Sequence, residues 1–479
     1  GGAIGNNSTG SHSLKYGKTD VYVEECEAVL ADGTVHTFGE RRVAALRAEA
    51  DPDADDLRPR IYAAVLDLLD EEAGEVERRY PTLKRNVSGY NLDTLVDEAY
   101  DAPPSEGGEP TGTVNLARLL AGSEGTLAVV TEATVSLEPV PSTKAVALLT
   151  YDSVLDAMED VAPILEHGPA AVEVMDDVLL GLAAETTEFA DVVSMLPEGT
   201  DSVLLVEFYA EDADEGRRRV ADLVADRVPG ATSEAEPTPD GVRSDAPTRA
   251  RHALEAHDAA TRARFWKMRK SGLPILLSRT SDAKHAAFIE DTAIPAENLP
   301  AYVADFQDVL AEHDTFTSYY AHAGPGVLHM RPLVNTKTVE GVETLESIAD
   351  AVTDLVVEYG GSVSGEHGDG RARTQWNRKL YGDRLWEAFR DLKTAFDPDW
   401  LLNPGTVCGD HDATEHLRFD PAYEFDAGFE PSMNWPGDNG FQGMAELCHG
   451  CGGCRGPQET TGGVMCPTYR ASREEITST

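Results

Sequence analysis

Between residues 143 and 410 the chain alternates short apolar strand patterns with amphipathic helix patterns, and this alternation constrains the fold more than any other feature. The expected elements are strands at 146–151 and 203–209, helices at 154–165 and 212–225, and a second strand–helix series from about 284 to 396. Asp212 is a suitable N-cap for the second helix. Such a pattern builds layers of helices on a sheet, so we predict an α+β fold.

The first 141 residues contain two glycine-rich loops, at 1–10 and 122–126. The other expected elements are strands near 21–23 and 28–30, a turn at 31–34, a helix at 61–79, an exposed loop at 103–108 and a strand at 127–130. Residues after 410 have few periodic apolar positions until the cysteines begin. We therefore predict four parts: 1–141, 142–410, a connector at 411–440, and a cysteine-containing module at 441–479.

The net charge excludes one large class of partners. The chain carries 85 acidic and 40 basic side chains, a formal charge of −45, which argues against nucleic-acid binding. No run of about 18 apolar residues is present, so we expect no transmembrane segment. The acidic excess runs along the whole chain, and only ten of the basic residues are lysine. This composition favours a halophilic source, where salt screens the self-repulsion.

The two ends of the chain suggest a fragment. Gly1 begins inside a loop pattern with no secretory signal, and residues 470–475 look like the start of a helix that is cut off. We therefore expect a piece of a longer protein. We expect that protein to be cytoplasmic, and we leave open a peripheral attachment at the inner face of the cell membrane.

Four cysteines lie within 19 residues near the C-terminus, with the spacing Cys-x2-Cys-x2-Cys-x11-Cys-Pro. They are Cys448, Cys451, Cys454 and Cys466. This density in a long chain indicates a metal site in a reducing compartment rather than a disulfide framework. The CxxCxxC run and the final Cys-Pro favour an iron–sulfur cluster, with zinc as the alternative. Whether all four share one cluster is left open; Cys26 and Cys408 are interpreted as buried or incidental thiols.

Both glycine-rich loops are candidates for holding a pyrophosphate, because glycine lets exposed backbone amides approach a ligand closely. Neither loop contains GxGxxG between a strand and a helix, so neither indicates a nicotinamide site. A tight turn without any ligand remains an equal alternative for each loop taken alone.

Two further segments carry imidazoles and a carboxylate. His322 and His329 flank a Gly-Pro-Gly turn, and Glu366 and His367 follow an apolar helix pattern at 348–359. Two histidines and one glutamate form a ligand set for a divalent ion with open positions. A neighbouring neutral histidine is suited to take a proton from a hydroxyl group. Unrelated histidines on a surface turn are the alternative for the first pair.

Together these segments predict a two-electron oxidation followed by the export of single electrons. A cation would hold a carboxylate, a base would take a hydroxyl proton, and the cysteine module would carry electrons away. A cofactor must then convert an electron pair into single electrons, and flavin does this. The residues by themselves favour a flavin dehydrogenase.

Several segments resemble one known family, in the order in which that family carries them. Residues 1–17 resemble the second flavin-binding loop of the vanillyl-alcohol-oxidase-type FAD fold, and residues 122–127 resemble its GSEGTLG segment, with Ala128 in place of the last glycine. The segments around His322, Glu366 and 402–405 are similar to the C-terminal domain of FAD-linked D-2-hydroxyacid dehydrogenases. These include D-lactate dehydrogenases, the glycolate oxidase flavin subunit and D-2-hydroxyglutarate dehydrogenases.

The resemblance extends to the cysteines, because residues 448–473 are similar to the iron–sulfur segment of the long, fused members. It implies part of an FAD-binding PCMH-type domain, then an FAD-oxidase C-terminal α+β substrate domain, then the start of a helical 4Fe-4S ferredoxin-type module. The implied cofactors are FAD, a 4Fe-4S cluster and a zinc-like divalent metal.

Individual positions take roles from the same resemblance. His322, His329 and Glu366 would hold the divalent ion, and His367 would be the base that removes the hydroxyl proton. The positions implied to line FAD are Asn7, Ser8, Thr9, Gly10, Gly122, Glu124, Gly125, Thr126, Val130 and Asn403.

The substrate carboxylates are assigned to basic residues. Arg269 and Lys284, fifteen positions apart, resemble the family's Arg…Lys pair, with surface solvation as the alternative. Arg331 stands where some members have asparagine, and it adds a carboxylate contact suited to a diacid or is only structural.

The chain also departs from the family pattern. Pro325 and Val327 replace the aspartate and asparagine of the commoner HAGDGNLH form. The family's first flavin-binding loop is absent from this sequence, so whether the chain binds FAD unaided is left open.

The expected function is oxidation of a D-2-hydroxyacid to the 2-oxoacid, with D-lactate as the first choice of substrate and D-2-hydroxyglutarate or glycolate as alternatives. The expected electron acceptor is a quinone, a cytochrome or an electron-transfer protein, rather than oxygen or NAD. The rivals are an aryl-alcohol or alkyl-ether lipid oxidase of the same fold, and a non-catalytic electron-transfer subunit. Oligomeric state is not predicted.

Overall fold

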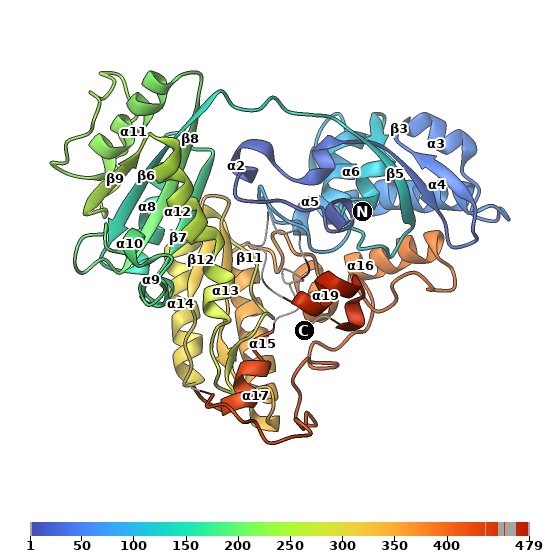
Figure 1. Ribbon diagram of the computed structural model, residues 1–479. Helices are drawn as coiled ribbons and strands as arrows, with labels where there is room; N and C mark the ends of the chain where they lie inside the picture. Colours follow the sequence, from blue (N-terminus) through green and yellow to red (C-terminus); the bar gives the residue numbers. More distant parts are fainter. Residues whose placement is uncertain (1, 436, 449–454, 456–465, 478–479) are drawn as a thin grey trace.

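The computed structural model describes residues 2–435, 437–448, 455 and 466–477. It consists of two lobes joined along a long helical segment that is broken at Gly382 (Figure 1). Residues up to about 141 form the first lobe, and the strands and helices from 143 to about 360 form the second. Both lobes mix helices with antiparallel sheet, so the predicted α+β class is confirmed. Cys451 and Cys454 lie outside the described residues.

A three-stranded antiparallel sheet of order β2-β1-β5 organises the first lobe. Its strands are β1 (Val23–Val29), β2 (Val35–Phe38) and β5 (Val129–Val135). The turn predicted at 31–34 connects β1 to β2, while the strand expected at 127–130 begins two residues later. The helix expected at 61–79 is nearly continuous: α4 (Leu57–Asp67) passes through a π-helical turn into α5 (Ala73–Arg79).

Shorter elements complete this lobe. They are α1 (Gly2–Gly5), α2 (Ser13–Tyr16), η1 (Thr19–Tyr22), β3 (Glu40–Arg42), α3 (Val43–Glu49), α6 (Leu92–Ala99), η3 (Pro104–Glu106), β4 (Thr113–Asn115) and α7 (Leu116–Leu120). The loop expected at 1–10 therefore contains one short helix, and β3 pairs with β4 in a separate ribbon.

The second lobe is built on a seven-stranded antiparallel sheet of order β11-β13-β12-β7-β8-β6-β9. The strands are β6 (Thr143–Tyr151), β7 (Ala171–Met175), β8 (Ser202–Ala210), β9 (His252–Ala256), β11 (Thr292–Ala293), β12 (Tyr319–His322) and β13 (Val327–Met330). A separate ribbon pairs β10 (Lys284–His285) with β14 (Leu333–Val334). The predicted strands at 146–151 and 203–209 are confirmed as parts of β6 and β8, whereas β7 was not predicted.

Helices cover both faces of this sheet (Figure 1). One face, with Ala147, Val174 and Val206, belongs to the large core and lies under α8 (Val154–Leu165), α11 (Ala213–Arg227) and α14 (Leu299–Glu312). The other face packs a smaller core against α9 (Asp177–Ala184), α10 (Ala190–Val193), α12 (Ala259–Lys270) and α13 (Gly272–Leu276). The bounds of α8 match the prediction, and the Asp212 side chain caps α11 by accepting from the Glu215 amide.

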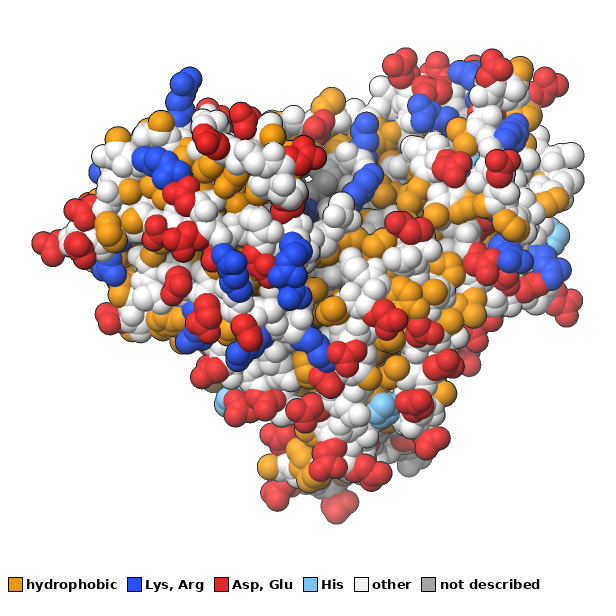
Figure 2. Space-filling model, turned by 180° about the vertical axis from the view of Figure 1, so that it is seen from behind, with side chains coloured by type: hydrophobic (Ala, Val, Ile, Leu, Met, Phe, Trp, Pro, Cys, Tyr) orange, Lys and Arg blue, Asp and Glu red, His pale blue; other side chains and the backbone are white. Residues whose placement is uncertain are grey.

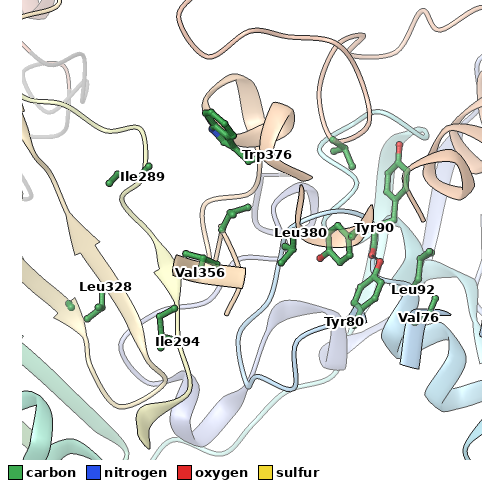
Figure 3. Close-up of a cluster of buried hydrophobic side chains, with 14 of the residues drawn as sticks. Val76, Tyr80, Tyr90, Leu92, Ile289, Ile294, Leu328, Val356, Trp376 and Leu380 are labelled. Carbon is green, nitrogen blue, oxygen red and sulfur yellow. Dashed lines mark hydrogen bonds between the residues drawn. The ribbon is translucent and has the colours of Figure 1, made fainter. Parts of the chain in front are cut away.

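Two long helical elements lie at the junction of the lobes. Helix α15 (Val339–Glu358) starts earlier than the predicted 348, and α16 (Gly370–Phe396) packs on α15 as well as on α4 and α5 of the first lobe. Figure 3 shows Tyr80 and Tyr90 of the first lobe on one side of Leu380, with Val356 and Ile294 on the other. The large core is therefore continuous across the lobes.

The segment after α16 runs back along the second lobe with little regular structure. Its elements are α17 (Gly440–Ala445), α19 (Pro467–Ser472) and η6 (Glu475–Thr477). Lys337 holds it in place, because its ammonium group lies 2.6 Å from Asp282 and 2.7 Å from Glu446. The same group lies over the rings of Phe419 and Tyr423.

Figure 2 shows acidic side chains spread over the whole of the viewed face, with basic ones among them. This distribution agrees with the even acidic excess of the sequence. Across the described ranges, no helix combines the length and apolar character that crossing a bilayer requires.

The buried thiols give a first testable expectation. Burial raises the pKa of Cys26 to about 11 and that of Cys408 to about 11. A raised thiol pKa leaves the reactive thiolate scarce until the pH approaches 11, so both residues should resist alkylation at pH 8 in the native protein. Iodoacetamide labelling with peptide mass spectrometry, with urea-unfolded protein as the control, measures this. Rapid native labelling of either residue would contradict their burial.

Candidate active site

Glu366 lies among three imidazoles, of which those of His322 and His329 are buried and that of His367 is exposed. It belongs to the segment between α15 and α16, and its Oε1 lies 3.4 Å from His322 Nε2, 3.0 Å from His329 Nε2 and 3.4 Å from His367 Nε2. The ring centroids of His322 and His329 are 5.1 Å apart, and those of His329 and His367 are 5.2 Å apart. The structure therefore brings together the predicted metal ligands and the predicted base.

The two ligand histidines are placed by one tight hairpin. His322 ends β12 and His329 lies in β13, with the Gly-Pro-Gly turn between them. Gly326 has φ +79°, and a Cβ there would collide with the Ile294 carbonyl oxygen, so this position requires glycine. The turn thus keeps both imidazoles on neighbouring strands, facing the Glu366 segment.

Three acidic residues that the sequence analysis did not name hold this cluster. Glu173 on β7 lies 2.8 Å from His322 Nδ1, and Glu290 lies 3.0 Å from His367 Nδ1 and 3.5 Å from His329 Nδ1. Asp291 has φ +93° and accepts hydrogen bonds from the amides of residues 366 and 367. It thereby fixes the backbone that carries Glu366.

Three buried arginines surround the same acids. Arg85 Nη1 lies 3.2 Å from Glu366 Oε2, Arg269 Nη2 lies 2.8 Å from Glu173, and Arg331 Nη2 lies 3.2 Å from Glu290. The Nε atoms of Arg269 and Arg331 are buried and donate to no acceptor in the described part of the chain. Unpaired buried donors of this kind suit an anionic ligand.

Lys284 is not brought into this cluster. Its ammonium group donates to the Arg279 carbonyl oxygen at 2.8 Å. Its charged neighbours are Glu446, Lys337, Asp282 and Arg418, and none of them belongs to the imidazole cluster. Burial lowers its pKa.

The electrostatics of the cluster follow from its geometry. Burial alone would raise the pKa of Glu366, but the three imidazoles hold it well below its usual value. Burial would likewise lower the pKa of His367, but Glu290 and Glu366 raise it to about 10. The carboxylates of the cluster thus stabilise positive charge on its imidazoles.

The two glycine-rich loops lie side by side next to this cluster. The Gly122 amide donates to the Ile4 carbonyl oxygen at 2.9 Å, and the Glu124 amide donates to that of Gly5 at 2.8 Å. Asn403 Nδ2 donates to the Glu124 carbonyl oxygen at 2.7 Å, and Asn6 Nδ2 donates to that of His367 at 2.7 Å. All the loop segments predicted to line FAD thus adjoin one another.

A cavity of about 250 Å³ opens at this junction, lined by Asn6, Ser8, Thr9, Glu366 and His367. The Thr9 hydroxyl donates to Glu366 Oε2 at 3.3 Å, while the Gly10 carbonyl oxygen accepts from Arg85. A Cβ on Gly10 would meet open space. The cavity thus lies between the loop at 6–9 and the segment that carries Glu366 and His367, where the sequence predicts the flavin.

Other predicted flavin residues also have structural partners. The Glu124 carboxylate accepts from the Asp369 amide at 2.6 Å and the Gly370 amide at 2.9 Å, so it caps the start of α16. Asn7 is buried and accepts from the Asp20 amide, and the Thr126 hydroxyl donates to the Ser123 carbonyl oxygen. Gly122 and Gly125 have φ values of +84° and +73°, and Val130 lies in β5, opposite Ala28.

The donor set at Glu366 fits a divalent cation. Asp291, His329, Glu366 and His367 place one ligand atom each within 4.8 Å of one another. His322 is outside this group, but its Nε2 lies 3.4 Å from Glu366 Oε1. Two imidazoles and a carboxylate are ligands that zinc and similar ions prefer. A ligand imidazole normally donates its other nitrogen to a carboxylate, and His322 does so here.

A signal for one of the missed residues was present in the sequence. Glu173 interrupts the apolar run of β7, and a lone acid in such a run needs a buried partner. Arg85 and Glu290 carry no comparable pattern, because their contacts join segments far apart in the chain.

Comparison with known proteins gives a family match. Residues 140–407 match the family model described as FAD linked oxidases, C-terminal domain. The match covers more than half of the chain and contains all the imidazoles of the cluster.

Curated relatives agree with this match. A D-2-hydroxyglutarate dehydrogenase of Pantoea ananatis is 29% identical over all of this chain and 44% of its own length. The glycolate oxidase subunit GlcD of Escherichia coli K12 is 31% identical over 70% of this chain and 62% of its own length. A probable mitochondrial D-lactate dehydrogenase of Danio rerio is 27% identical over 69% and 61%. The chain thus spans less than half the length of the first of these relatives.

Proposed function

Since this chain belongs to the FAD-linked oxidases, we propose that it carries the substrate site of an FAD-dependent dehydrogenase that oxidises a D-2-hydroxyacid to the 2-oxoacid. One observation supports this most: Glu366 lies between His322, His329 and His367, next to a cavity bordered by the loop at 6–9. Cation ligands, a base and a place for a flat cofactor occur together there.

His322, His329 and Glu366 are proposed to hold the divalent ion. Such an ion, when bound, supplies a positive charge that holds the substrate's hydroxyl and carboxylate oxygens and offsets the negative charge of Glu366. Arg269 and Arg331 are proposed to bind substrate carboxylate through their unpaired Nε donors.

His367 is proposed as the base. In the oxidation, the substrate loses the hydroxyl proton and a hydride from C2, and its C–O single bond becomes a carbonyl. Glu290 and Glu366 raise the pKa of His367, so its ring is protonated at neutral pH as long as no cation is bound. A cation bound at Glu366 would lower this pKa, and His367 Nε2 would then take the proton while Glu290 at Nδ1 stabilises the resulting imidazolium. FAD, when bound between the two glycine-rich loops, supplies the acceptor for the hydride.

The cysteine module is proposed to carry the electrons onward through a 4Fe-4S cluster to a quinone, a cytochrome or an electron-transfer protein. Cys448 is exposed and Cys466 is buried, while the other two cysteines are outside the described residues. The ion pair between Lys337 and Glu446 supports this proposal, because it holds the segment before the cysteines against the second lobe.

The substrate is proposed to be a dicarboxylate. Beside Arg269, Arg331 gives the site a second guanidinium with an unpaired Nε, and a relative that spans the whole chain is named for D-2-hydroxyglutarate. We therefore place D-2-hydroxyglutarate before D-lactate, reversing the order favoured by the sequence alone. D-lactate stays as the second candidate, because a relative of that name covers 69% of the chain.

Turnover of the whole protein with an artificial electron acceptor tests the proposal. D-2-hydroxyglutarate, D-lactate and glycolate should be compared with the L-enantiomers of the first two, together with the visible spectrum before and after substrate. We expect bleaching of the flavin bands and reduction of the acceptor with a D-acid. No reaction with any 2-hydroxyacid would reject the function, and activity that survives the loss of Glu366 would favour an alcohol or ether-lipid oxidase.

A further inference from the structure

One face of the seven-stranded sheet carries two buried glutamates, and each of them contacts an imidazole and a basic side chain. Glu173 on β7 and Glu207 on β8 point to the same face, because Ala171 pairs with Glu207 and side chains alternate along a strand. Their side chains are 0% and 1% exposed. Each contacts one imidazole and one basic side chain, but only Glu173 contacts the Glu366 cluster.

Glu173 makes two contacts that belong to different parts of the site. Both of its carboxylate oxygens face His322 Nδ1, at 2.8 and 2.9 Å. One oxygen also lies 2.8 Å from Arg269 Nη2. A single buried carboxylate therefore joins a proposed metal ligand to a proposed substrate arginine.

The contact with His322 decides which ring nitrogen faces the cation site. A carboxylate accepts hydrogen bonds, so Nδ1 donates and carries the proton. In the neutral ring, Nε2 is then left with its lone pair, and it lies 3.4 Å from Glu366 Oε1. Without Glu173, the protonation of the two nitrogens would no longer be fixed.

The contact with Arg269 balances charge. The guanidinium is always charged and only 6% exposed, so it needs an anion nearby. Glu173 supplies that anion at Nη2 and leaves Nε without an acceptor among the described residues. The arginine is thus held in place with a donor still available to a ligand.

We propose that Glu173 is a positioning residue that fixes His322 for cation binding and Arg269 for substrate carboxylate binding. The inference rests on the proposed function, since it presumes a cation at Glu366. It adds that the two binding events share one residue on β7, the middle strand of the seven-stranded sheet.

The test compares cation affinity in Glu173→Gln and Glu207→Gln, measured on the whole protein by Co²⁺ titration against a chelator, without turnover. Glu207 is the matched control, because it is equally buried and bonds His12, Lys144 and Trp266. We expect Glu173→Gln to weaken Co²⁺ binding about 10- to 100-fold, the usual effect of losing a carboxylate behind a ligand imidazole, and Glu207→Gln to leave it unchanged.

Arg269→Gln separates the two contacts. It should raise KM for the hydroxyacid without weakening Co²⁺ binding, because Glu173 still holds His322. Equal Co²⁺ affinity in Glu173→Gln and wild type, or an equal loss in Glu207→Gln, would overturn the inference. If the wild type shows no Co²⁺ site that Glu366→Gln removes, the proposed function itself fails. Thermal unfolding of each variant identifies any effect due to misfolding.

Discussion

Replacing Glu366 by glutamine is expected to lower kcat/KM for the D-2-hydroxyacid by about 10³-fold or more, the largest effect on activity of any single substitution in the site. Its carboxylate is the shared neighbour of His322, His329 and His367, so the neutral amide removes the charge that would hold the cation and orient all three rings. Steady-state kinetics and metal analysis of the purified protein measure the loss.

The same substitution also leaves Arg85 without its carboxylate partner, so a loss of stability must be separated from a loss of chemistry. Circular dichroism and thermal unfolding make that distinction. Glu358→Gln, at the exposed end of α15, is the control and should leave kcat/KM unchanged. A Glu366→Gln protein that stays folded and active would refute the central role given to this carboxylate.

Replacing Arg227 by methionine is expected to lower the free energy of unfolding of the second lobe by about 3–5 kcal/mol. Arg227 and Asp160 are both 0% exposed, and Arg227 Nε lies 3.0 Å from Asp160 Oδ1. The only other side-chain partner of Asp160 among the described residues is the Tyr151 hydroxyl, at 2.8 Å. Removing the guanidinium therefore leaves a buried charge without its counter-ion.

Urea unfolding followed by circular dichroism checks this value. Arg217→Met is the matched control, because Arg217 lies on the same helix but pairs with Asp214 at the surface. Surface pairs of this kind contribute about 0–1 kcal/mol, so the control should unfold almost like the wild type. Similar midpoints for the two variants would show that the buried pair adds little.

Local structure was predictable from this sequence because it depends on neighbouring residues. The apolar periodicity predicted α8 to the residue, and Asp212 caps α11 as expected. Strand β7 was missed because Glu173 breaks its apolar pattern. The partner of Glu173 is His322, which lies 149 positions away in the sequence and comes next to it only in the folded chain.

The part of the site that lies in recognisable sequence motifs was predicted. His322, His329, Glu366 and His367 were identified and do meet. Arg85 lies 281 positions from Glu366, and its neighbours in sequence give no hint of the contact. The family resemblance placed Lys284 in the site, whereas in the structure its ammonium group donates to the Arg279 carbonyl oxygen, away from the imidazole cluster. For Glu124, folding adds a cap on α16 to the proposed flavin role.

Helix α16 has a consequence for any attempt to study the matched family region in isolation. Tyr381 and Phe389 lie on α16 and pack their rings against Tyr80 and Tyr90 of the other lobe. A truncation near residue 140 would remove the first lobe and expose these aromatic rings to solvent as an apolar patch. The family-matched region, residues 140–407, is therefore not expected to fold as an independent domain, and it should aggregate when it is expressed alone.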